Sequence, residues 1–127
     1  MLFRSIFAEG TLSDGGSYTE TYDRTSADIV ILTVKMYYPN GVLKREEVWF
    51  GDILASETIG EEDGSKVIHQ YDGGSFVETQ TNYNSAGIVV FEYIKSFDGT
   101  ETRKYYDDNG VLEYTEITRP DGTVERS

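Results

Sequence analysis

Apolar and polar residues alternate along much of the chain with a period of two, rather than the 3.6 of a helix. The clearest example is the segment 28–38, whose alternate positions are Val30, Leu32, Val34, Met36 and Tyr38. This period is typical of a β-strand whose two faces meet different surroundings. Similar runs recur between turn residues, and no segment has a helical period with caps. The pattern predicts an all-β protein built as an antiparallel up-and-down meander of about 10–11 strands.

The segment 28–38 also has apolar residues on the face that should be polar, namely Ile29 and Ile31. Strands that are buried on both faces contain nearly continuous apolar runs. We therefore expect the start of this strand to be covered on both sides. A second strand, around Phe91 and Tyr93, has apolar residues on both faces in the same way.

Glycine flanked by Asp, Asn or Pro marks the turns, because these pairs supply the positive φ angles of tight hairpins. One series of turn glycines has a regular spacing of 23 residues: Gly41, Gly64, Gly87 and Gly110. A second series falls between them: Gly51, Gly74, Gly99 and Gly122. This spacing predicts two-strand units near 37–59, 60–82, 83–105 and 106–127. True repetition and the natural spacing of a regular meander both explain it.

At 127 residues the chain has room for one domain, spanning 1–127, with one core. A meander of this length closes into an up-and-down barrel or remains an open hairpin ladder. Even strand lengths favour the barrel, since closure removes exposed sheet edges. The regular interval and the doubly apolar strand favour the open ladder. We expect the barrel and keep the open hairpin-repeat sheet as the alternative.

Two segments carry a resemblance to known hairpin repeats. Tyr37-Tyr38-Pro39-Asn40-Gly41-Val42-Leu43-Lys44-Arg45-Glu46 resembles the opening of a bacterial MORN-type repeat, with paired aromatics followed by Asn-Gly. Segment 106–112, followed by 120–123, is similar to that unit and to the YD repeats of large secreted shells. The resemblance covers roughly residues 37–127, although the second and third units lack the aromatic pair. It implies protein–protein scaffolding, and it implies no catalytic residues.

The charge and composition restrict the partners. A formal net charge of −12 repels nucleic-acid phosphates and anionic lipid, so we expect neither nucleic acid nor membrane as a partner. The chain contains no cysteine, which excludes disulfides, thiolate zinc sites and cysteine nucleophiles. No apolar run is long enough to span a membrane, and the apolar start is too short for a signal peptide. We expect a cytoplasmic or a virion or other assembly-associated location.

The sequence contains no convincing reaction centre. His69 is the only histidine, and it alternates with Val67 and Tyr71 on a predicted strand. No motif places a nucleophile or further metal ligands beside it. The acidic runs 61–64 and 107–110 lack the ligand spacing of a calcium loop and fit turn chemistry instead. We therefore expect no catalytic residue, no metal and no cofactor; enzymatic activity stays open, with a non-enzyme favoured.

Three functional hypotheses remain. The first is a non-catalytic binding or structural protein that docks on other proteins, as an oligomer or within a larger assembly. Its expected interface residues are Ile29, Ile31, Trp49 and Phe50. The second is a lipocalin-like barrel around a small apolar ligand. Its expected cavity residues are Val34, Met36, Phe91 and Tyr93. The third is an acidic inhibitor or immunity-type protein that captures a basic partner.

Overall fold

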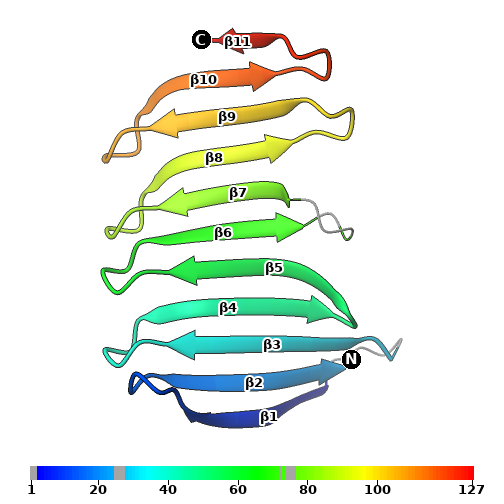
Figure 1. The fold of residues 1–127 in the computed structure, drawn as a ribbon, viewed down its shortest axis with the longest axis vertical. Helices are drawn as coiled ribbons and strands as arrows, with labels where there is room; N and C mark the ends of the chain where they lie inside the picture. Colours follow the sequence, from blue (N-terminus) through cyan, green and yellow to red (C-terminus); the bar gives the residue numbers. More distant parts are fainter. Residues whose placement is uncertain (1–2, 25–27, 72, 74–76) are drawn as a thin grey trace.

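The computed structural model describes residues 3–24, 28–71, 73 and 77–127, which form one antiparallel sheet of eleven strands (Figure 1). The strands are β1 (Phe3–Thr11), β2 (Ser17–Arg24), β3 (Val30–Tyr37), β4 (Leu43–Phe50), β5 (Ile53–Gly60), β6 (Lys66–Tyr71), β7 (Val77–Tyr83), β8 (Val89–Lys95), β9 (Glu101–Tyr106), β10 (Leu112–Thr118) and β11 (Val124–Arg126). Each strand pairs with its neighbours in sequence, from β1 at one edge to β11 at the other. This confirms the all-β meander and its strand number. The described part of the chain contains no helix that could cross a membrane.

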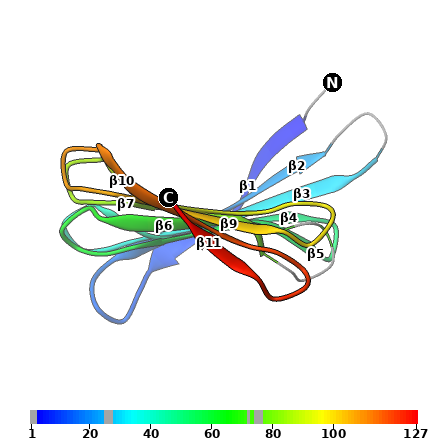
Figure 2. The same ribbon diagram turned by 90° about the horizontal axis from the view of Figure 1, so that it is seen from above.

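The sheet is open, so the expected closed barrel is wrong. β1 and β11 lie at opposite ends of the long axis and do not pair (Figure 1). Closure requires the two edge strands to meet with a fixed tilt and stagger. Here the strands rotate progressively about the long axis instead, as Figure 2 shows from above. This twist, which all sheets share, carries the two edges apart rather than toward one another.

One type of turn makes most of the described connections. It spans five residues, its glycine occupies the fourth position with a positive φ, and it occurs at 12–16, 38–42, 61–65, 84–88, 96–100, 107–111 and 119–123. In the turn at 107–111 the amide of Asp107 donates to the carbonyl of Val111 at 2.9 Å, and Gly110 N–H donates back to Asp107 at 3.0 Å. The Gly110 φ of 85° is open to glycine at little cost. This geometry explains why Asn-Gly and Asp-Gly pairs punctuate the sequence.

The turns fall at the predicted interval. Those that begin at 38, 61, 84 and 107 lie 23 residues apart and all occupy the same side of the sheet (Figure 1). Each predicted unit therefore holds one such turn and two strands. Of the second series, Gly51, Gly99 and Gly122 occupy turns on the other side, while Gly74 lies outside the described residues.

Successive turns on the common side contact one another. The Tyr38 hydroxyl donates to the Gly60 carbonyl at 2.8 Å, and the Asn40 amide donates to the Glu62 carbonyl at 3.3 Å. Two units further, the Asn84 amide donates to the Asp108 carbonyl of the next turn in the row at 3.1 Å. Backbone hydrogen bonds join successive hairpins along their strands. These side-chain hydrogen bonds join them at their turns as well. We refer to this row of turns, together with the turn at 12–16 on the same side of the sheet (Figure 1), as the turn edge.

The strand register divides the side chains between two faces. We call one face the aromatic face. It carries the even-numbered residues of β3 and the residues that the register places on the same side of every other strand. Among them are Tyr18, Tyr22, Leu32, Met36, Trp49, Leu54, Ile59, Phe91, Tyr93, Tyr105 and Tyr114. The threonine face carries the intervening residues, among them Thr19, Thr21, Thr33, Thr58, Thr79, Thr81, Thr102 and Thr115. The two faces therefore differ in chemistry along the whole sheet.

The sheet is a single layer, and none of the described hydrophobic side chains is buried. No described part of the same chain covers both sides of the start of β3, because Ile29 is 49% exposed. The accessible surface of the chain is 8053 Å². A compact monomer of 14.3 kDa exposes about 6,800 Å². The chain therefore exposes more surface than a compact monomer of its mass. In a β-sandwich, a second sheet would cover this extra surface.

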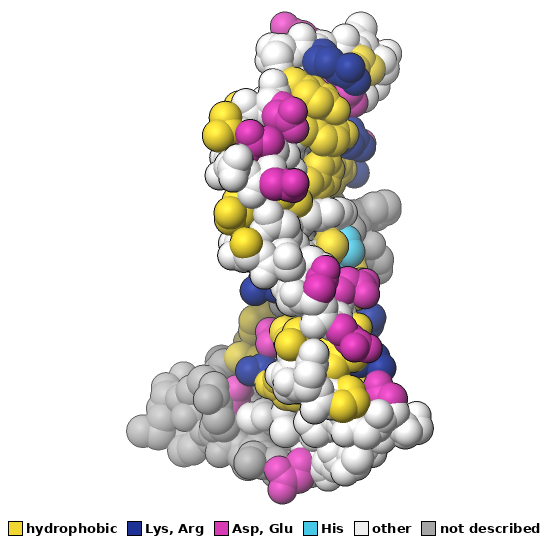
Figure 3. Space-filling view, turned by 90° about the vertical axis from the view of Figure 1, so that its left-hand side faces the viewer, with side chains coloured by type: hydrophobic (Ala, Val, Ile, Leu, Met, Phe, Trp, Pro, Cys, Tyr) yellow, Lys and Arg dark blue, Asp and Glu magenta, His cyan; other side chains and the backbone are white. Residues whose placement is uncertain are grey.

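Aromatic side chains stack across neighbouring strands in place of a core. The ring centroids of Phe91 and Tyr105 lie 5.1 Å apart, and those of Tyr105 and Tyr114 lie 4.4 Å apart. The Arg126 guanidinium lies 4.9 Å from the Tyr114 centroid and extends this stack to β11. Figure 3 shows a band of hydrophobic side chains in the upper part of the view, where the C-terminal strands lie. Cross-strand pairs of this kind stabilise sheets directly.

The variant Gly60→Ala should destabilise the sheet. A Cβ at this position would lie 2.0 Å from the Leu43 carbonyl oxygen, so the backbone must move. We expect the free energy of unfolding to fall by about 1–3 kcal/mol, as for other forced overpacking. Urea unfolding followed by circular dichroism measures this change. Ser56→Ala, on the same strand, is the control; equal stability of both variants would contradict the close approach.

Acid should destabilise the hairpin turns. Hydrogen bonds from Ser65 to the Asp63 carboxylate hold its pKa below 3.8, and turn hydrogen bonds lower the pKa values of Asp14, Asp98 and Asp121 in the same way. A carboxylate with a lowered folded-state pKa adds stability above its unfolded pKa, and that stability is lost as the pH falls. The melting temperature should therefore drop between pH 4 and pH 2 (about the window of these groups). A smaller drop in Asp63→Ala is the expected control result, and an unchanged wild-type melting temperature would refute the assignment.

Candidate functional site

Three of the predicted interface residues lie near one another, and the fourth lies on the opposite face. Ile31 and Phe50 are register partners on the threonine face, and Phe50 pairs in turn with Ile53. Ile29 directly precedes β3. These residues, Ile29, Ile31, Phe50 and Ile53, form what we call the edge patch, in which Phe50 is 47% and Ile53 is 46% exposed. Trp49 lies on the aromatic face instead, because successive side chains of a strand point to opposite faces.

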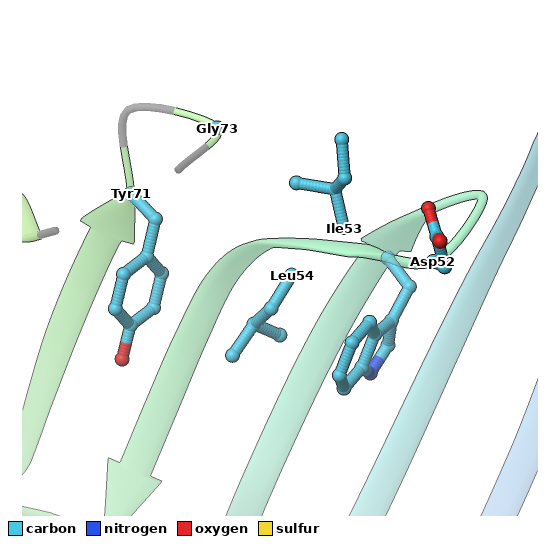
Figure 4. Close-up of a pocket in the computed structure, with 6 residues that line it drawn as sticks. Asp52, Ile53, Leu54, Tyr71 and Gly73 are labelled. Atoms are coloured by element: carbon cyan, nitrogen blue, oxygen red, sulfur yellow. The ribbon is translucent and has the colours of Figure 1, made fainter. Parts of the chain in front are cut away.

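Trp49 borders a shallow pocket at the end of β4–β6 (Figure 4). The pocket has a volume of about 350 Å³ and is also lined by Leu54, the register partner of Trp49, and by Tyr71. Figure 4 shows Tyr71 and Leu54 on adjacent strands, next to each other. Burial raises the pKa of Tyr71, and the nearby Glu57 carboxylate raises it further. The phenol is therefore neutral at physiological pH, and the pocket combines apolar contact with the Tyr71 hydroxyl and the Asp52 carboxyl group.

A polar row crosses the middle of the aromatic face beside this pocket. Glu47 and Glu57 are register partners on β4 and β5, and Arg45 lies between them. The Arg45 guanidinium donates to Glu47 at 3.0 Å and to Glu57 at 2.7 Å. Like charges that face each other directly on adjacent strands are destabilising. Arg45 removes that repulsion, so the three groups form a compensated cluster.

His69 continues the row on β6. Its Nε2 atom lies 3.1 Å from the Gln80 amide oxygen, and the Gln80 amide donates to Asn82 at 2.9 Å. Its Nδ1 atom lies 4.0 Å from a Glu57 carboxylate oxygen, beyond hydrogen-bond distance. The histidine is half-buried among polar neighbours.

The polar row does not have the geometry of a reaction centre. A nucleophile would need a base at hydrogen-bond distance and a third group that orients the base. Arg45 binds the carboxylates of both Glu47 and Glu57. The Nε2 atom of His69 already has the amide oxygen of Gln80 as its partner. Within the described residues, no group of three or more His, Asp or Glu side chains is arranged to hold a metal ion. The observed contacts fit a ladder that links β4 to β7.

The predicted cavity residues do not surround one space. Val34, Met36, Phe91 and Tyr93 all lie on the aromatic face. However, the first two are on β3 and the last two on β8, with four strands between them. Tyr93 instead contacts Arg103, whose guanidinium lies 5.0 Å from the ring centroid. The expected ligand cavity required the sheet to close into a barrel. Because the sheet is open, these four residues do not enclose a cavity.

Charge is distributed unevenly between the faces and the turn edge. At register-paired positions of the aromatic face, acidic and basic residues are equal in number: Glu20, Glu47, Glu57, Glu101 and Glu116 against Arg24, Arg45, Lys95, Arg103 and Arg126. The turns of the turn edge contain Asp14, Glu61, Glu62, Asp63, Asp107 and Asp108, and no Lys or Arg. Figure 3, which looks onto this edge, shows its acidic groups. The net charge of −12 is thus carried largely outside the aromatic face.

Comparison with known proteins adds no assignment: no protein-family model and no curated protein matches the chain.

The sequence interpretation missed the Arg45–Glu47–Glu57 cluster and the edge-patch residue Ile53. Alternation alone would have placed Arg45 and Glu47 on one face. Glu57 could not be placed there by counting back from the turn at Gly51, because a bulge between Val48 and Trp49 shifts the register. The signal for Ile53 was available, since a two-residue turn makes it the partner of Phe50.

The variant Arg45→Met should destabilise the protein by leaving Glu47 and Glu57 opposed without compensation. We expect a loss of roughly 1 kcal/mol in the free energy of unfolding, since both carboxylates are partly solvated. Denaturant unfolding at low ionic strength measures the loss. Adding Glu57→Gln to this variant should restore much of it, because the opposed charges are then gone. No recovery in the double variant would show that Arg45 acts through packing alone.

Proposed function

We propose that this protein is a non-catalytic structural or binding component that docks on other proteins through the faces of its sheet. The observation that carries the proposal is the single layer, in which none of the described hydrophobic side chains is buried. Sheets normally pack one apolar face on another layer. A chain that leaves apolar side chains of both faces in contact with solvent gains stability when a partner covers them.

The composition of the exposed surface also supports docking. Tyrosine, tryptophan, phenylalanine and arginine are the residues that contribute most to protein–protein interfaces. On the aromatic face they occur together, for example as the Tyr93–Arg103 and Tyr114–Arg126 pairs. These side chains are held in place by neighbouring strands, so little side-chain entropy is lost when a partner binds.

The experiment that tests the proposal is native mass spectrometry of the protein purified from its own source. We expect a complex whose mass exceeds that of one chain by one or more polypeptides. A monomer at all accessible concentrations, with no polypeptide bound, would overturn the proposal.

The edge patch should contribute to such a complex. Replacing Ile31 with Asp places a charge among Ile29, Phe50 and Ile53, where a partner would have to desolvate it. We expect at least about tenfold weaker assembly, with the β signal in circular dichroism retained. Thr33→Asp, two residues along the same face of β3, is the matched control. An undiminished complex in the Ile31→Asp variant would exclude the edge patch from the interface.

The acidic turn edge favours a second candidate function, the capture of a basic partner. Asp14, Glu61–Asp63 and Asp107–Asp108 are brought to one side of the sheet although they are far apart in sequence. Charge-driven association of this kind weakens steeply as ionic strength rises. Affinity that stays constant between low and high salt would rule it out, whereas docking through the faces would survive.

A further inference from the structure

We propose that the aromatic face is covered by a second copy of this chain, so that two sheets form a face-to-face sandwich. The inference rests on the proposed docking function and names the occupant of one face; the edge patch lies on the opposite, threonine face and would serve a contact separate from this dimer. The surface is the face that carries Leu32, Trp49, Phe91, Tyr105 and Tyr114.

The area of uncovered surface matches what a stable dimer requires. The chain exposes 8053 Å², which exceeds the surface of a compact monomer of its mass by on the order of 1,200 Å². A stable protein–protein interface buries about 800 Å² on each partner. One dimer contact across a face of the sheet therefore accounts for most of the excess.

The dimensions of the sheet lead to the same area. Eleven strands spaced about 4.8 Å apart, each six to eight residues long for the most part, make a face of roughly 50 by 23 Å. That face covers about 1,100 Å², enough for a standard interface even if the edges do not overlap. Two sheets with the same twist pack in this way at a small angle and about 10 Å apart.

The charge balance identifies a second copy as the occupant. A partner with a net charge of −12 would be repelled by an acidic surface. The aromatic face carries balanced charges, and several of them pair within the face: Arg45 bonds Glu47 and Glu57, Arg103 bonds Glu101, and Arg126 donates to Glu116 at 2.9 Å. Face-to-face packing leaves the acidic turns along the rim of the dimer, in solvent. Two-fold symmetry is also the commonest arrangement of identical chains.

The threonine face is a poorer candidate for the same contact. Over β2–β4 this face is lined by Thr19, Thr21, Thr33, Lys35 and Glu46, which border a polar hollow of about 430 Å³. Hydroxyl and charged groups of this kind keep their water unless the partner supplies matching hydrogen bonds. The aromatic face instead offers rings that lose water at little cost.

Sedimentation equilibrium across the micromolar range, with a pair of adjacent variants, tests the proposal. Val34 and Thr33 are neighbours on β3 but lie on the aromatic and threonine faces, respectively. Val34→Arg places an arginine between Glu20 and Glu47, so the monomer accommodates it, whereas the dimer interface does not. We expect the wild type to be a dimer, Val34→Arg to weaken it at least about tenfold, and Thr33→Arg to leave it unchanged. Circular dichroism checks that both variants are folded.

A spin-label measurement tests the face without a disruptive substitution. The chain contains no cysteine, so Val67→Cys and Ile68→Cys each supply one labelling site. These adjacent residues of β6, near the middle of the sheet, lie on the aromatic and the threonine face. We expect a short inter-chain distance for the Val67 label and a distance longer by about two sheet thicknesses for the Ile68 label.

The possible results distinguish a wrong face, a wrong occupant and a wrong docking function. A dimer that is weakened by Thr33→Arg rather than Val34→Arg, or a shorter distance from the Ile68 label, would overturn the choice of face. A chain that stays monomeric alone but binds a different polypeptide would overturn the second copy and leave the docking function in place. A chain that binds neither itself nor any other polypeptide would overturn both.

Discussion

Because the sheet is a single layer, contacts between adjacent strands must supply the stabilisation that a shared core supplies in most proteins. A lone hairpin is marginal in water, and stability grows only as further strands add a hydrophobic face. In this chain the aromatic stack from Phe91 to Tyr114 and the compensated charges around Arg45 act between neighbouring strands. Each hairpin therefore depends mainly on the two strands beside it, as in other quasi-one-dimensional proteins.

The five-residue turn makes this local arrangement regular. Its glycine, such as Gly110 with a φ of 85°, returns the chain at a fixed register, and a side-chain oxygen such as that of Asp107 accepts the turn amides. Recurrence of the turn on one side of the sheet places its polar groups in a row. The same feature that closes each hairpin thus concentrates negative charge along the turn edge. The same local motif therefore determines both the hairpin geometry and the negative charge of the turn edge.

This separation of charge has a consequence for association. The aromatic face remains balanced and rich in rings, while the turn edge repels other acidic surfaces. An acidic partner, such as a second copy of this chain, would therefore meet less repulsion at a face than at the turn edge. Unpaired sheet edges are also a hazard, because they invite further strands. At β11 the edge strand is only three residues long, which limits that route of growth.

Alternation and turn chemistry were sufficient to predict the strands, their antiparallel order and the positions of the turns. These features depend on interactions within a few residues, which a sequence displays directly. Period-two alternation was also enough to place Val34 with Met36 and Phe91 with Tyr93, whereas the register across β4–β7 decides that both pairs share one face. By contrast, the open sheet and the contact of Glu57 with Arg45 were decided only in three dimensions. The first depends on twist accumulated over eleven strands, and the second on a bulge beside Trp49 that shifts the register by one residue. No single position of the sequence determines the accumulated twist or the shifted register, because both depend on how neighbouring strands pair.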